Sequence, residues 1–128
     1  MVVLMRKRFL LVVGMLSVGT AAATAWRAID ASGQEVQVVE IAAERFSFTP
    51  SEIRTRMGVR LEIRLRSDDT DHGFHIIGAD TNVRIPKRGK GSITVTFEPP
   101  NAGRYTFECN KLCGAGHDFM RGTIIVSK

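Results

Sequence analysis

Residues 109–120 read CNKLCGAGHDFM, and this stretch holds both cysteines of the 128-residue chain together with one of its three histidines. As metal ligands, it offers two thiolates, an imidazole and a thioether in the spacing C-x3-C-x3-H-x2-M. Soft sulfur ligands combined with imidazole favour copper, because magnesium and calcium prefer oxygen and zinc is usually held by thiolate, imidazole and carboxylate. The stretch therefore predicts a copper site on a loop.

The second cysteine distinguishes this pattern from a mononuclear blue copper site, which needs one cysteine, two histidines and a weak axial methionine. Two thiolates can bridge two copper ions, and each ion then requires one imidazole and accepts one weak axial ligand. We expect Cys109 and Cys113 to be the bridges and His117 to be one imidazole. Met120 and the backbone carbonyl of Lys111 are the expected axial ligands, and the other imidazole comes from elsewhere in the chain.

The spacing of the cysteines by itself leaves other interpretations open. Two cysteines in an exported chain often form a disulfide, which would make the protein a stapled binding module without metal. Two cysteines and two histidines also form zinc sites. A copper-delivery protein is a further alternative. Only Met57 and Met120 among the five methionines lie beyond the N-terminal region, which argues against copper storage.

The N-terminus predicts export. Three basic residues, Arg6 to Arg8, precede the apolar run 9–18 and the small residues 19–25, which is the pattern of a secretory signal peptide. The alternative is an uncleaved transmembrane helix from Phe9 to Trp26, at the short limit for a bilayer span. Residues 1–26 are thus a signal peptide or a membrane anchor, and residues 27–35 read as a polar linker. In both cases the following domain lies on the periplasmic side, either soluble after cleavage or anchored to the cytoplasmic membrane.

The net charge of +5 arises from 18 Lys and Arg against 13 Asp and Glu. Three of the positive charges precede the apolar run, and the remaining charges of both signs are mixed along the chain, as on a solvated surface. We therefore expect no nucleic-acid partner. Because the sequence also shows no nucleophile–base pair, we do not expect the chain to be an enzyme by itself.

Residues 36–128 read as a domain of short strands. Residues 60–66 alternate strictly between charged and apolar side chains, which is typical of a strand with Leu61, Ile63 and Leu65 facing inward. Further strands are expected at 36–43, 52–56, 72–77, 83–85, 93–97, 105–109 and 122–127. Seven or eight such strands, separated by glycine and proline turns, predict an all-β sandwich with Greek-key connections, preceded by one N-terminal apolar helix.

The string C-x3-C-x3-H-x2-M near the end of a β-rich chain closely resembles the binuclear copper (CuA) loop of cytochrome c oxidase subunit II and of nitrous oxide reductase. The resemblance covers roughly residues 36–128 and is closest to the single-helix subunit II of small-type haem-copper oxidases. It implies a cupredoxin fold with the metal loop between the last two strands. It also implies one-electron transfer through a centre of two copper ions.

The resemblance selects the second imidazole from two histidines. An aspartate shortly before the histidine and a Gly-Phe pair after it are features of the family, and they single out His72. His75 lies three residues further along the same expected strand, so its side chain points to the opposite face. We therefore expect His72 to be a copper ligand and His75 to be structural.

The partners implied by the resemblance are a c-type cytochrome as electron donor and a haem-copper oxidase as acceptor. The chain is then either the electron-accepting subunit of an oxidase or a free-standing periplasmic carrier. Lys111 stands where the mitochondrial subunit has a glutamate that helps to hold magnesium, so that magnesium site is not expected here. We expect Phe107, Leu112 and Phe119 to keep water from the metal, and His117 to lie nearer the surface.

Overall fold

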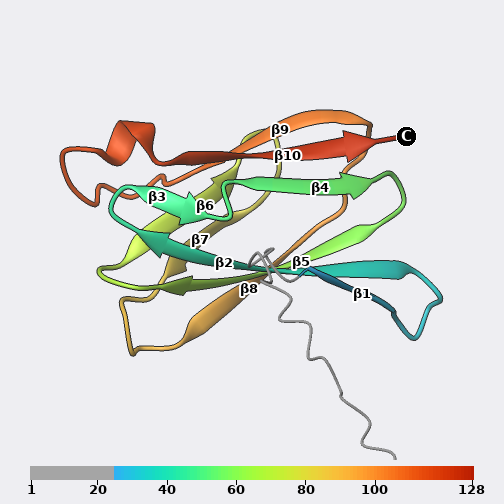
Figure 1. Ribbon diagram of the computed structural model, residues 1–128, viewed down its shortest axis with the longest axis horizontal. Helices are drawn as coiled ribbons and strands as arrows, with labels where there is room; N and C mark the ends of the chain where they lie inside the picture. Colours follow the sequence, from blue (N-terminus) through green and yellow to red (C-terminus); the bar gives the residue numbers. More distant parts are fainter. Residues whose placement is uncertain (1–24) are drawn as a thin grey trace, which may run out of the picture.

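The computed structural model describes residues 25–128, which form two packed β-sheets (Figure 1). The strands are β1 (Trp26–Ile29), β2 (Glu35–Glu44), β3 (Ser47–Thr49), β4 (Glu52–Arg56), β5 (Arg60–Ser67), β6 (His72–Ile76), β7 (Asn82–Ile85), β8 (Ser92–Phe97), β9 (Gly103–Glu108) and β10 (Arg121–Ser127). A 3-10 turn, His117–Phe119, lies between the last two strands. Within residues 25–128 no helix has the length and apolar character needed to span a membrane. The predicted signal peptide or anchor falls almost entirely on residues 1–24, outside the described range.

The strands assemble into a sandwich of two five-stranded sheets. One sheet has the order β1-β2-β5-β8, with β3 paired to β2, and the other has the order β4-β10-β9-β6-β7. Neighbouring strands are antiparallel except for β2 with β5 and β4 with β10. The all-β prediction is therefore confirmed for the described residues. Because β9 and β10 are antiparallel neighbours, the segment that joins them, residues 109–120, forms a loop at one end of the sandwich (Figure 1).

The core follows from the alternation of side chains along the strands. Leu61, Ile63 and Leu65 on β5 are fully buried, as their spacing predicts, while the charged residues between them face outward. Burying an aliphatic side chain of this size contributes about 1.5–3 kcal/mol. The register of β5 against its neighbours is thus set by which face carries the apolar residues.

An aromatic cluster connects the core to the end of the sandwich that carries the loop. The rings of Phe48, Phe74 and Phe107 are fully or almost fully buried, with centroids 5.3 to 5.8 Å apart. Phe74 lies two residues after His72 on β6, and Phe107 lies two residues before Cys109 at the end of β9. Residues two apart on a strand share a face, so the cluster packs on the same side as these two site residues. It provides a buried apolar base beside them.

Residues 27–35 were predicted to be a polar linker, but the first three of them belong to strand β1. Trp26–Ile29 forms β1 and pairs antiparallel with β2, so this stretch is a hairpin of the first sheet. The carboxylate of Asp30 accepts hydrogen bonds from the backbone of Ser32 and Gln34 and closes the turn. Trp26, the expected end of an uncleaved apolar helix, lies in strand β1 instead. The guanidinium carbon of Arg64 lies over the Trp26 ring, 5.5 Å from the centroid of that ring. The sequence predicted a linker from its polar composition. An exposed edge strand has the same composition, so composition alone does not distinguish the two.

Candidate metal centre

The candidate metal centre is built where β6, β9 and the loop 109–120 meet. His72 is the first residue of β6, and Cys109 directly follows β9. Cys113 lies within the loop. One imidazole nitrogen and the two sulfur atoms of these residues lie within 4.8 Å of one another, and all three side chains are buried. Within residues 25–128 this is the only cluster of at least three histidine, cysteine or acidic side chains with such spacing.

The other predicted ligands lie around the same two sulfur atoms. The Sγ atoms of Cys109 and Cys113 are 3.8 Å apart and both thiols are free; a disulfide bond would place them about 2.05 Å apart. The Lys111 carbonyl oxygen lies 3.1 Å from the Cys109 sulfur. His117 Nδ1 lies 3.8 Å and Met120 Sδ 3.9 Å from the Cys113 sulfur. The structure thus brings all six sequence-predicted site residues together, and their role as ligands stays a prediction.

The two histidines of β6 occupy different environments. His72 is fully buried, its Nε2 lies 2.7 Å from the Asp69 carboxylate, and its Nδ1 has no hydrogen-bond partner among the described residues. A carboxylate at Nε2 fixes the proton on that nitrogen and leaves the Nδ1 lone pair free to ligate a metal. His75 is only partly buried, and its Nδ1 lies 2.8 Å from the Thr81 carbonyl. The structure therefore places His72 beside the cysteines and directs His75 elsewhere.

Gly73 allows β6 to approach the loop closely. A Cβ atom at this position would lie 2.1 Å from Asn110 Oδ1 and 2.8 Å from the Lys111 backbone nitrogen. Its backbone N–H donates to the Cys109 sulfur at 3.4 Å, a contact that stabilises a thiolate. The Asn110 side chain is held in turn by a 2.8 Å hydrogen bond to Asn82 on β7. These contacts lock the first half of the loop against the β6–β7 pair.

Titratable groups around the loop have displaced pKa values. Burial, reinforced by the neighbouring Cys109 thiol, raises the pKa of Cys113 from 9.0 to about 11. Burial also acts to raise the pKa of Asp69, but hydrogen bonds from His72 and from the backbone N–H of Arg45 outweigh it and lower that pKa to about 2. Hydrogen bonds from Lys111 and Arg84 hold the pKa of Asp71 well below its usual range. A metal bound to Cys113 would therefore have to displace a thiol proton at neutral pH.

The structure corrects the predicted apolar shell. Phe107 is fully buried as expected, but Leu112 is 78% and Phe119 is 83% exposed. The reason is geometric, because the loop turns the side chains of Cys109, Cys113 and Met120 inward, and Leu112 and Phe119, which lie between them, face solvent. His117 is half-buried, in agreement with the expectation that it lies nearer the surface than the fully buried His72.

Two residues beside the loop were not predicted from the sequence. Arg45 and Phe46 belong to the bend between β2 and β3, at the same end of the sandwich as the loop (Figure 1). The Arg45 Nε donates to the Cys113 carbonyl at 3.1 Å, and the Phe46 ring lies against two loop glycines. No local motif marks them, since 68 residues separate Arg45 from Cys113.

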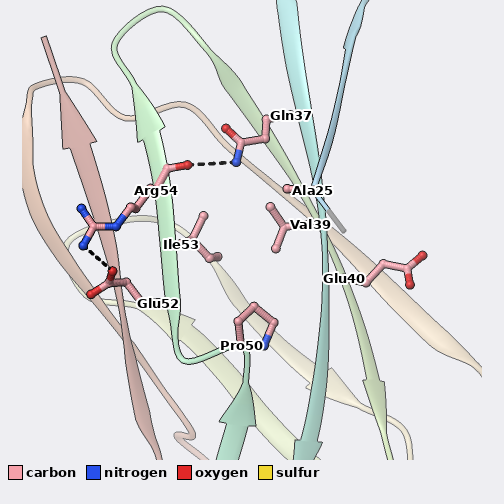
Figure 2. Close-up of a pocket in the computed structure, with 8 residues that line it drawn as sticks. All are labelled: Ala25, Gln37, Val39, Glu40, Pro50, Glu52, Ile53 and Arg54. Atoms are coloured by element: carbon pink, nitrogen blue, oxygen red, sulfur yellow. Dashed lines mark hydrogen bonds and ion pairs between the residues drawn. The ribbon is translucent and has the colours of Figure 1, made fainter. Parts of the chain in front are cut away.

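A groove of about 260 Å³ lies apart from the candidate centre, beside β2 and β4 (Figure 2). The Gln37 side chain donates to the Arg54 carbonyl at 3.0 Å, and Arg54 pairs with Glu52 at 2.7 Å. Val39 and Ile53 line its apolar part. The groove contains none of the predicted ligands and no thiol or imidazole, so it does not compete with the loop as a metal site.

The chain is similar to known proteins in sequence and in fold. Residues 10–126 match the family of cupredoxin-like domains. The chain is 32% identical over 102 residues to cytochrome c oxidase subunit 2 of Thermus thermophilus, a match that spans 80% of this chain and 74% of that protein. A second cytochrome c oxidase subunit 2 from the same species shows the same identity over 60% of its own length. A chain of a haem-copper terminal oxidase dimer is 28% identical with a TM-score of 0.64, covering 88% of this chain and 76% of that one.

Proposed function

Because the chain belongs to the family of cupredoxin-like domains and is a relative of cytochrome c oxidase subunit 2, we propose that it transfers single electrons through a bound copper centre. The observation that carries the proposal is the convergence of two free thiols, two imidazoles and a thioether at one end of the sandwich. This donor set matches the preference of copper for soft sulfur combined with imidazole. The buried His72 Nδ1, which has no partner among the described residues, is the kind of donor that a metal would satisfy.

We further propose that the centre holds two copper ions. Cys109 and Cys113 would bridge them, His72 and His117 would each supply an imidazole, and Met120 and the Lys111 carbonyl would be weak axial ligands. When bound, such a pair shares one unpaired electron, so that a change of redox state alters geometry and solvation little.

The chain's own residues would keep that rearrangement small. Asp69 orients His72, and the Gly73 N–H holds the Cys109 sulfur. Both sulfurs and the Met120 thioether are buried, so water is kept from the centre. The half-buried His117 would then be the shortest route from the centre to the surface. Ligands held in this way move little when the redox state changes. The residues that hydrogen-bond to the ligands influence the affinity and the potential of the metal, in addition to the ligands themselves.

The nature of the centre is tested on the full-length protein purified in mild detergent and loaded with copper. We expect two copper ions per chain and a paramagnetic resonance spectrum in which one electron couples equally to two copper nuclei. Cys109→Ser and Cys113→Ser should each lose this shared state, because only one bridging sulfur remains. One copper per chain would contradict the binuclear centre. A colourless zinc protein or a stable disulfide would contradict the copper function.

We propose a c-type cytochrome as the electron donor and a haem-copper oxidase as the acceptor, on the periplasmic side of the membrane. The relationship to oxidase subunit 2 supports the acceptor, and the N-terminal basic and apolar pattern supports export. Co-purification of haem and a large multi-helix subunit would identify an oxidase subunit. A lone copper protein that oxidises reduced cytochrome c stoichiometrically would identify a free-standing carrier. Transfer of copper to an apo-acceptor without any electron exchange would instead support copper delivery.

The N-terminal element is tested by intact-mass measurement on protein from the native membrane and periplasm. Loss of the first 23 or 25 residues would show a cleaved signal peptide, and retention would show a membrane anchor. A cytoplasmic protein with reduced thiols would contradict both.

A further inference from the structure

The bend between β2 and β3 contacts both halves of the proposed centre. The Arg45 side chain donates from Nε to the carbonyl of Cys113 at 3.1 Å. Its backbone N–H donates to the carboxylate of Asp69 at 3.0 Å, and that carboxylate binds His72 Nε2 at 2.7 Å. Arg45 is far from the loop in sequence, yet it contacts the backbone of one predicted ligand, Cys113, and the carboxylate that binds another, His72.

Phe46, the next residue, fits against the loop backbone. A Cβ atom at Gly116 would lie 2.3 Å from the Phe46 ring, and one at Gly114 would lie 2.9 Å from it. The ring thus fills the space that side chains at these two positions would otherwise need. Gly114 also has a φ of 140°, a backbone conformation that L-residues with side chains rarely adopt. The ring and the two glycines together define the path of the loop between Cys113 and His117.

We propose that Arg45 and Phe46 are positioning residues of the metal loop, and that the charge of Arg45 favours the reduced state of the centre. The proposal rests on the proposed function, because it concerns the same centre. Arg45 and Phe46 ligate nothing; they act by fixing the backbone that presents Cys113 and His117. A rigid loop is what a one-electron site needs, since ligands that are held in place rearrange little.

The charge effect has a defined sign. Oxidation makes the centre more positive, so a guanidinium nearby disfavours the oxidised state and raises the reduction potential. A unit charge at roughly 10 Å in an effective dielectric constant of ~20 shifts a one-electron equilibrium about tenfold. Arg45 is exposed, so solvent screening reduces the shift, and we expect roughly threefold.

The test compares four full-length variants: Arg45→Met, Arg45→Lys, Phe46→Ala and Arg104→Met. Arg104→Met is the matched control, because it removes the same charge at a greater distance from the loop. Arg104 lies on β9 five residues before Cys109, about 17 Å along the strand. Three quantities are measured for each variant: hydrogen exchange of the amides of residues 109–120 in metal-free protein, the paramagnetic spectrum after copper loading, and the reduction potential.

Arg45→Met should speed loop exchange at least threefold, alter the copper hyperfine pattern and lower the potential by ~30 mV, the equivalent of a threefold shift for one electron. Arg45→Lys should keep the potential near that of the wild type but still speed exchange, because lysine retains the charge and loses the planar donor. Phe46→Ala should speed exchange without the charge effect. The proposal is overturned if Arg45→Met and Phe46→Ala match Arg104→Met in exchange and spectrum. If the wild-type protein binds no copper, the proposed function fails, and exchange in the metal-free chain still decides whether the two residues position the loop.

Discussion

Replacing Gly73 by alanine tests whether the close approach of β6 to the loop builds the site. The added Cβ would lie 2.1 Å from Asn110 Oδ1 and 2.8 Å from the Lys111 backbone nitrogen, both closer than real Cβ contacts occur. The first contact is with a side chain that can turn away, but the second is with backbone. The loop must therefore move off the strand, which weakens the 3.4 Å contact from the Gly73 N–H to the Cys109 sulfur. Overpacking of this kind costs about 1–3 kcal/mol, and we expect Gly73→Ala to lie at the upper end of that range.

The assay is denaturant unfolding of the metal-free protein, followed by copper loading and spectroscopy. Asn110→Ala serves as the companion variant, because it removes the nearest clashing atom and also the 2.8 Å hydrogen bond to Asn82, at a cost of about 1 kcal/mol. The double variant should be more stable than the sum of the two single effects predicts, since alanine at 110 relieves part of the clash. It should not regain wild-type stability, because the Lys111 nitrogen remains in the way. A Gly73→Ala protein with wild-type stability and an unchanged copper spectrum would refute the reasoning, and strictly additive effects would show that the two residues do not meet.

Three further predictions concern the ligands and their neighbours. His72→Ala should abolish the binuclear spectrum while His75→Ala keeps it, because only His72 lies beside the cysteines; the opposite result would mean that the register of β6 is shifted by one residue. Asp69→Asn should weaken copper binding about 10- to 100-fold by loosening the hold on His72, as measured by competition with a chelator, and an unchanged affinity would remove Asp69 from the site. The raised pKa of Cys113 means that the folded metal-free chain keeps a proton that the unfolded chain loses above about pH 9, so its unfolding free energy should fall between pH 9 and 11. Cys113→Ser should remove this fall, and a stability that is flat or rising over that interval in the wild type would contradict the assignment.

The sequence by itself determined the features that depend on local spacing. The alternation at residues 60–66 predicted which side chains of β5 are buried, because successive side chains of a strand point to opposite faces. The same parity separated His72 from His75. The spacing C-x3-C-x3-H-x2-M predicted that Cys109 and Cys113 would turn to one point, and the structure brings them within 3.8 Å. Each of these inferences concerns residues close together in the chain.

Only the tertiary structure decided how that loop is held. Arg45 and Phe46 reach it because β2, β3 and the β9–β10 loop end at the same edge of the sandwich, a result of sheet pairing across most of the chain. The outward turn of Leu112 and Phe119 likewise follows from the path of the loop over the core, since their apolar character alone predicted burial. Burying a hydrophobic side chain stabilises the folded state against any apolar surface that covers it. The composition of the sequence does not say which surface that will be. The contacts that place the predicted ligands are therefore non-local, although all of these ligands except His72 lie in one short stretch of sequence.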